Sequence, residues 1–275
     1  MLWFLLLLTL VESKVHILQS DQMFLENHPI NDSMAVHESD LIDITHDVWK
    51  EITTICPGIK RNASIDVFFD YTLEDTGTLA WNTHPMKLLN GVLKAKRDYM
   101  TIGVNPHPTN GWFFGENCTD ISYRYDLRSV LRHEILHGLG IASSIYKTNN
   151  IWTVGFNVND NCYPTQYDTL ITDIIGDKVV EGCTLKKNIN GQKVFVNDVQ
   201  LFNPISYNPS SFSHHTYDGG LMYWRLSPSK CMYIEEHETK MLKALGIDCQ
   251  YTAPDQQSVA LLLAPLMLSL FFPLF

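Results

Sequence analysis

The chain has 275 residues, of which 45% are hydrophobic and 18% are charged, and its formal net charge at pH 7 is −10. This length suits one substantial domain or two small ones, and the composition excludes an intrinsically disordered chain. The acidic balance, without any run of Lys or Arg, offers no electrostatic reason to bind nucleic acid or an anionic membrane surface.

An apolar segment opens the chain. Residues 1–13 are almost entirely apolar and end in small or modest side chains, which is the pattern of a secretory signal peptide before its cleavage site. Acceptor sequons for N-glycosylation lie at Asn31, Asn62 and Asn117, as on the surface of an exported glycoprotein. We therefore expect a secreted protein whose folded domain spans residues 14–250.

The cysteines predict disulfide bonds. They are Cys56, Cys118, Cys162, Cys183, Cys231 and Cys249. None belongs to a C-x-x-C pair, so three disulfides in an oxidising compartment fit the pattern better than a zinc ribbon does. Six cysteines allow 15 pairings, and we expect neighbours in the sequence to pair with each other.

The first half of the domain predicts one helix and three strands. Residues 40–54 carry apolar side chains at helical spacing, and Ser39 or Asp40 can cap the first turn. Segments rich in β-branched and aromatic residues follow, with the alternation of strands. The predicted strands span residues 65–69, 77–81 and 99–104.

The second half predicts two more helices around a loop-rich segment. A helix begins after Asp126, and residues 149–208 are rich in Asn, Gly and Asp, with short strands such as 193–196. A last helix spans residues 234–245 and is stopped by Gly246, since glycine accepts the conformation that ends a helix. Helices and strands mix without a βαβ rhythm, which predicts the α+β class.

A polar spacer and an apolar tail close the sequence over residues 251–275. The apolar part, residues 259–275, would span about 26 Å as a helix, which is shorter than a hydrocarbon core of about 30 Å. A polar spacer followed by such a tail is typical of the signal for a glycosylphosphatidylinositol anchor. The alternative is a short tail anchor that spans the membrane. Both predict attachment to the outer face of a membrane.

The second helix carries a motif for metal chemistry, His133-Glu134-Ile-Leu-His137. Two imidazoles four residues apart lie on one helical face and can bind one ion together. Glu134 lies one step round the helix, where it can take a proton from a metal-bound water. Zinc lowers the pKa of such a water to about 7 and polarises a carbonyl, as peptide hydrolysis requires. Gly140 is positioned to stop the helix.

The motif from His133 to Gly140 resembles that of the metzincin metallopeptidases. Their usual third histidine would fall at position 143, which is Ser here. The resemblance is closer to the leishmanolysin-like branch, in which the third histidine follows a long insertion. Residues 213–222 are similar to that branch's Ser-His element and the methionine turn after it, which implies His214 as the third ligand and Met222 as packing beneath the metal.

This resemblance implies a zincin-like fold: a twisted mixed sheet, an active-site helix, a C-terminal helix and one Zn²⁺. It also implies that residues 77–81 form an exposed edge strand beside the inner strand over 99–104. An edge strand offers unpaired backbone groups to which an extended substrate can add as another strand.

Several roles stay open at this point. His215 is the reserve for the third metal ligand, and a carboxylate of the last helix is the alternative: Glu235, Glu236 or Glu238. Tyr223 is a candidate to contact a reacting oxyanion, although a tyrosine beside a core methionine is more often structural.

We therefore predict a secreted or cell-surface zinc endopeptidase that acts on peptides or proteins. The alternatives are an inactive surface adhesion or binding protein on the same fold, and a zinc hydrolase that acts on a non-peptide bond.

Overall fold

The computed structural model describes residues 38–251, apart from residues 61, 75, 117, 150, 187 and 188. The predicted signal peptide, the C-terminal tail, Asn31 and Asn117 lie outside the described residues. Asn62 is described and is exposed. Within the described part of the chain, no helix is both long and apolar enough to cross a membrane.

The described chain combines three α-helices with several small sheets, which confirms the predicted α+β class. The helices are α1 (Glu38–Ile55), α2 (Leu127–Gly138) and α3 (Glu236–Ala244). The strands of the first half are β1 (Ser64–Phe69), β2 (Ala80–Thr83), β3 (Met86–Leu89), β4 (Val92–Ala95), β5 (Tyr99–Val104), β6 (Trp112–Phe113) and β7 (Tyr125–Asp126). Those of the second half are β8 (Tyr146–Thr148), β9 (Ile151–Thr153), β10 (Phe156–Val158), β11 (Asn161–Tyr163), β12 (Thr172–Asp173), β13 (Val180–Glu181), β14 (Thr184–Leu185), β15 (Val194–Val196) and β16 (Val199–Gln200).

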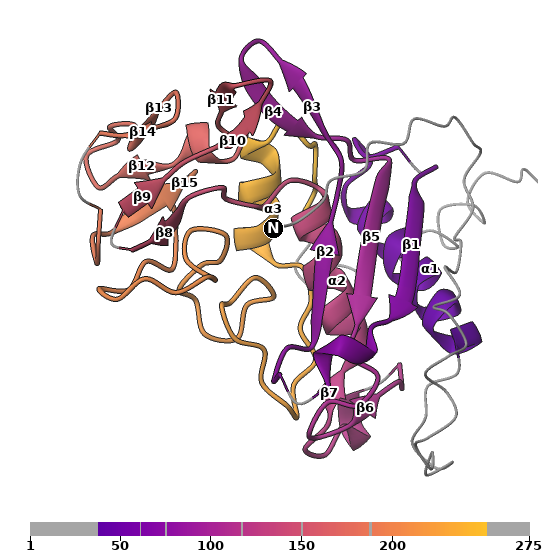
Figure 1. Ribbon diagram of the computed structural model, residues 1–275. Helices are drawn as coiled ribbons and strands as arrows, with labels where there is room; N and C mark the ends of the chain where they lie inside the picture. The colour runs from indigo at the N-terminus through magenta and orange to yellow at the C-terminus, as the bar shows by residue number, and fades with distance from the viewer. Residues whose placement is uncertain are drawn as a thin grey trace, which may run out of the picture.

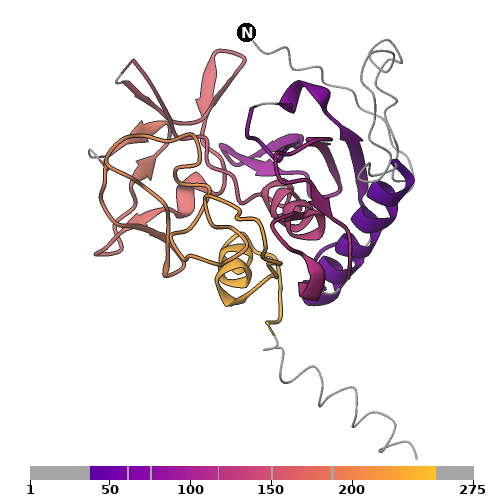
Figure 2. The ribbon, with the colours of Figure 1, turned by 90° about the horizontal axis from the view of Figure 1, so that it is seen from below.

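The main sheet has the strand order β1-β5-β2 and is mixed. β5 runs parallel to β1 and antiparallel to β2, and α1 and α2 pack against one face of this sheet (Figure 1). Seen from below, α2 lies end-on between this sheet and the short hairpins of the second half (Figure 2). The helix with the predicted metal motif is therefore central in the molecule.

The strand predicted over residues 77–81 lies further along the chain, since β2 spans Ala80–Thr83. The preceding residues form a turn in which Gly77 has a φ of +75°, a left-handed conformation that glycine adopts without steric cost. The side chain of Asn105 holds this turn by donating to the carbonyls of Leu73 and Thr78 (3.0 and 2.9 Å). The long-range contact from Asn105 displaces the start of the strand.

The first and last helices are confirmed, with shifted ends. α1 begins at Glu38, so Ser39 and Asp40 lie inside its first turn and do not precede it. α3 begins at Glu236, because Glu235 and Glu238 form a reciprocal capping box that places the first turn there. It ends before Gly246, which has a φ of +76° as predicted for a helix stop.

All six cysteines form disulfides, but the predicted pairing is correct for one pair only. The pairs are Cys56–Cys249, Cys118–Cys231 and Cys162–Cys183. The first two join residues 193 and 113 positions apart, so each constrains a large loop of the unfolded chain. The expectation of neighbour pairing fails because the end of the domain returns to the helices of its first half. Three disulfides indicate an oxidising, extracellular environment.

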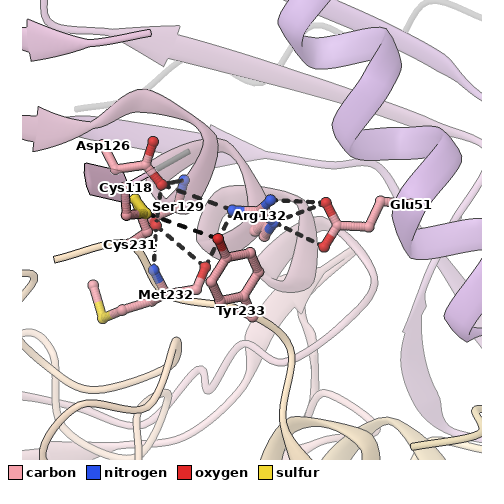
Figure 3. The surroundings of a disulfide bond; sticks show 8 residues. All are labelled: Glu51, Cys118, Asp126, Ser129, Arg132, Cys231, Met232 and Tyr233. Atoms are coloured by element: carbon pink, nitrogen blue, oxygen red, sulfur yellow. Dashed lines mark hydrogen bonds and ion pairs between the residues drawn. A yellow bond between two sulfur atoms is a disulfide. The ribbon is translucent and has the colours of Figure 1, made fainter. Parts of the chain in front are cut away.

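The disulfide Cys118–Cys231 lies at the start of α2 (Figure 3). The Asp126 carboxylate caps this helix by accepting a hydrogen bond from the Ser129 N–H (3.0 Å). The Ser129 Oγ in turn accepts from the N–H of Met232 (2.6 Å), in the segment that the disulfide brings close. The covalent bond and the capping hydrogen bonds together fix the first turn of the metal-motif helix.

Arg132, on the next turn of α2, also ties this helix to its neighbours (Figure 3). Its guanidinium makes a bidentate ion pair with Glu51 of α1 (2.8 Å at the shortest). It also donates a hydrogen bond to the Met232 carbonyl (3.2 Å). The ring of Tyr233 lies against the guanidinium, 4.8 Å from its central carbon. The planar guanidinium therefore joins α1, α2 and the late segment through three kinds of contact.

We expect Arg132→Ala to lower the free energy of unfolding by about 3 kcal/mol, because breaking a buried ion pair leaves uncompensated charge and polar groups. The value stays near the lower end of the usual range because the Glu51 side chain is 31% exposed. Arg128→Ala is the control: Arg128 pairs with Asp47, which is 56% exposed, and such pairs contribute about 1 kcal/mol or less. Chemical denaturation of both variants measures the difference, and equal losses would contradict the anchoring role.

Candidate metal centre

α2 presents the two histidines of the motif on one face. His133 is buried, His137 is partly exposed, and Glu134 between them is buried. The helix ends at Gly138, and Gly140 follows with a φ of +114°, which agrees with its predicted place in the helix stop. A β-carbon at Gly138 would lie 2.7 Å from the sulfur of Met100, so glycine allows this helix end to approach the sheet closely.

A third imidazole reaches the pair from far along the chain. The Nε2 atoms of His133 and His137 lie 3.1 Å apart, and the Nε2 of His214 lies 3.1 Å from the former and 3.2 Å from the latter. Within the described residues these are the histidine, cysteine and acidic side chains that gather closely enough to hold a metal ion. The three nitrogens form a nearly equilateral triangle.

The other nitrogen of each ring identifies the tautomer. The Nδ1 atoms of His133, His137 and His214 lie 2.8, 2.6 and 2.7 Å from backbone carbonyl oxygens of Leu221, Ile141 and Ser210. A carbonyl only accepts, so each Nδ1 carries the proton and each neutral ring has a bare lone pair at Nε2. Three lone pairs thus converge without a proton between them, an arrangement that a bound cation could stabilise.

Electrostatics keep these rings neutral. Burial lowers the pKa of all three imidazoles, and neighbouring histidines lower those of His133 and His214 further. The pKa of His214 falls to about 3. Metal ions bind imidazole in its neutral form, so the cluster is ready to bind a metal at neutral pH without releasing protons from these rings.

The spacing of the triangle fits zinc. Bonds of about 2.05 Å in tetrahedral geometry place ligand nitrogens roughly 3.3 Å apart, close to the observed 3.1–3.2 Å. Backbone carbonyls that hold the Nδ1 protons also supply the outer contacts typical of metal-binding histidines. The site is therefore a buried three-histidine cluster that could hold a metal ion, with His133, His137 and His214 as its ligands.

The alternative third ligands face elsewhere. The Nε2 of His215 lies 2.8 Å from the Glu238 carboxylate, and both side chains are fully buried. Glu235 takes part in the capping box of α3, and Glu236 pairs with Lys240 on the surface (2.9 Å). None of these side chains joins the three-histidine cluster.

The predicted methionine turn lies directly beyond the third histidine. Met222 is fully buried, its N–H donates to Glu238 (3.0 Å), and its carbonyl accepts from the N–H of His215 (2.9 Å). Tyr223 is half-buried with its ring tilted against Trp224 (5.8 Å between ring centroids). These contacts give Tyr223 a packing role and leave its predicted oxyanion contact a prediction.

Sequence reasoning missed the buried carboxylate of Asp168. It accepts hydrogen bonds from the hydroxyls of Ser143, Ser144 and Thr165 and from backbone N–H groups of the last two. Ser143 occupies the position at which a nearby third histidine would fall. Asp168 lies in a segment rich in Asn, Gly and Asp, where its residue type alone carries no signal of burial.

We expect His214→Ala to weaken zinc binding about a hundredfold. Structural zinc sites bind with about 10–16 kcal/mol in total, so one ligand contributes about 3 kcal/mol, and 1.4 kcal/mol corresponds to a factor of ten. Competition with a chromophoric chelator measures the affinity. His107→Ala, which removes a half-exposed imidazole, is the control and should bind zinc as the unmodified protein does. Undiminished affinity in His214→Ala would remove this residue from the ligand set.

No protein-family model, no curated protein and no solved structure matches this chain.

Proposed function

We propose that the protein is an extracellular zinc-dependent endopeptidase of zincin type. The observation that carries this proposal is the convergence of three unprotonated Nε2 atoms at 3.1–3.2 Å, with the buried carboxyl of Glu134 on the same helix. A mixed sheet above α2 and a C-terminal helix, α3, support the zincin-like architecture that the motif implies.

Glu134 is the proposed general base and proton donor. When zinc is bound by the three histidines, it lowers the pKa of a bound water to about 7 and polarises the substrate carbonyl. The carboxylate oxygen of Glu134 takes a proton from the attacking water and later gives it to the departing amine. Burial raises the pKa of Glu134 to about 8, and a nearby dication favours the ionised form that a base needs.

The edge strand β2 supports a peptide as the substrate. Among the described strands, β2 pairs with β5 alone, which leaves its outer backbone groups available. Its residue Asn82 lies at the end of α2, where a β-carbon on Gly138 would be 3.0 Å from the Asn82 amide nitrogen. An extended peptide that hydrogen-bonds to β2 as an additional strand would therefore pass close to the histidine cluster.

Two measurements test this proposal. The purified protein should contain about one zinc per chain, and it should cleave a peptide library in a reaction that a chelator stops and added zinc restores. Zinc without peptide cleavage would favour the inactive binding protein or a hydrolase for another bond. A protein without bound metal after equilibration with zinc would refute the proposal.

A further inference from the structure

The third ligand of the proposed metal centre comes from a loop. His133 and His137 are fixed by the backbone of α2, whereas His214 lies 77 residues beyond His137 and outside any helix or strand. Its ring donates to the Ser210 carbonyl (2.7 Å) four residues earlier in the same loop. This local contact sets the ring's orientation and cannot place the loop against α2, so other contacts must do so.

On the N-terminal side of His214, the preceding residue is tied to a buried acid. The Ser213 Oγ accepts a hydrogen bond from the backbone N–H of Ser143 (2.9 Å), in the segment that follows α2. The Ser143 hydroxyl donates to Asp168 (2.7 Å), which is fully buried. Asp168 also holds Ser144 and Thr165, so it fixes the segment to which Ser213 is attached.

On the C-terminal side, the following residue is tied to a second buried acid. The Nε2–H of His215 donates to Glu238 at 2.8 Å, and both side chains are fully buried. The same carboxylate accepts from the N–H groups of Met222 and Glu235 (both 3.0 Å). A β-carbon at Gly220 would lie 2.5 Å from the Cε1 of His215. The ring therefore packs closely against the backbone of Gly220 and has little room to move.

We infer that Asp168 and Glu238 are positioning residues for the third metal ligand, His214. Asp168 acts through Ser143, whose N–H holds Ser213, and Glu238 binds His215 directly. A ligand borne by a loop loses more conformational freedom on binding a metal than one borne by a helix, unless the loop is fixed beforehand. The His214 carbonyl accepts from the Phe202 N–H (2.8 Å), and the two buried carboxylates add side-chain fixation on each flank. The inference rests on the proposed metal site.

Ser213→Ala and Glu238→Gln test the two sides separately. Ser213→Ala removes the hydroxyl that accepts from Ser143, and Glu238→Gln replaces the carboxylate with a neutral amide of the same shape. Each should weaken zinc binding about 10-fold, the lower end of the usual effect for a group that directly holds a metal ligand, because both act through a residue beside His214. Ser213→Thr keeps the hydroxyl, so this variant should bind zinc as tightly as the unmodified protein does.

Matched controls and a spectroscopic measurement separate positioning from general stability. Ser229→Ala removes a hydroxyl that accepts from the Tyr123 N–H (2.8 Å), and Glu236→Gln changes a surface acid on the same helix turn as Glu238. Both controls should bind zinc normally. The visible absorption spectrum of the Co²⁺-loaded protein reports ligand geometry, and it should change in Ser213→Ala and Glu238→Gln but in neither control.

The outcomes distinguish the inference from the proposed function. Tight zinc binding by the unmodified protein, with unchanged affinity and Co²⁺ spectrum in Ser213→Ala, overturns the role of Asp168. The same result in Glu238→Gln overturns the role of Glu238. An unmodified protein that binds no zinc overturns the proposed function, and the positioning roles with it.

Discussion

Glu134→Gln should retain zinc while the rate of peptide cleavage falls by about 10²- to 10⁴-fold, the usual contribution of a positioned general base. Glutamine has the same shape and fills the same buried space on α2, so the three histidines should keep their positions. Its amide cannot accept a proton from water. Zinc content and the initial rate on a peptide found by library digestion are the two measurements.

Glu51→Gln is a control for the same chemical change, at an acid that faces Arg132 from α1 and not the histidine cluster. The Glu51→Gln variant should cleave peptide at the rate of the unmodified protein when equal amounts of folded protein are compared. Retained cleavage in Glu134→Gln would remove this residue as the base, even if zinc binding is normal. A parallel loss of zinc would mean that the substitution disturbs the ligands, and Glu134→Ala would then show whether the residue's bulk matters.

The parts of the fold that follow from local sequence are the parts predicted correctly. The apolar spacing over residues 40–54 gives α1, and the strand pattern over 65–69 and 99–104 gives β1 and β5. The spacing of His133 and His137 places both rings on one helical face, because four residues make about one turn. These features depend on neighbours within one element.

The features that the sequence could not predict depend on contacts between distant residues. Cys118 pairs with Cys231 because the segment after Met222 returns to the start of α2. The start of β2 is displaced by Asn105, which holds a turn about thirty residues earlier (27 and 32 residues). The pattern of residue types predicts neither this disulfide nor the shifted start of β2.

The third member of the histidine cluster shows the same limit. His214 and His215 are adjacent histidines in one loop, and the pattern of residues treats them almost equally. In the structure the His214 ring turns to α2, and the His215 ring turns to Glu238 of α3. Residue type therefore limited the histidine candidates to His214 and His215. The contact of His215 with Glu238 of α3 shows which of the two lies outside the cluster.

The metal-free protein should become less stable as the pH falls from 6.5 to 5. The pKa of each cluster histidine is lower in the folded protein than the ordinary 6.5, chiefly because of burial. Below pH 6.5 the unfolded chain binds protons that the folded cluster does not bind, and stability then decreases with falling pH. The stabilising contribution of these groups is fully present above pH 6.5. It is lost progressively as the pH falls from 6.5 to their pKa values in the folded protein.

The expected size is large for a protein of ordinary stability. Each histidine that stays neutral at pH 5 costs about 2 kcal/mol, at 1.36 kcal/mol per pH unit below 6.5. His214, whose pKa falls to about 3, His84, whose pKa is lowered to about 4 by burial and by His137, and His133, whose pKa burial lowers well below 6.5, together give about 6 kcal/mol. Glu134 acts oppositely: its raised pKa of about 8 adds about 2 kcal/mol of stability over the same interval. We therefore expect a net loss of about 4 kcal/mol, against a typical total of about 5–15 kcal/mol, and the lowered pKa of His137 acts in the same direction.

Urea denaturation of chelator-treated protein at pH 6.5 and pH 5 measures this loss. Metal-free His214→Ala provides the internal test, because removing one ring should reduce the difference between the two pH values by about 2 kcal/mol. Metal-free Glu134→Gln should increase it, since the opposing carboxyl is gone. Zinc at pH 6.5 should stabilise the unmodified protein, because it binds the folded cluster and excludes protons from the same lone pairs. Equal stability of the metal-free protein at both pH values would mean that the three rings are not held neutral, and the convergence of bare nitrogens on which the proposed metal centre rests would be wrong.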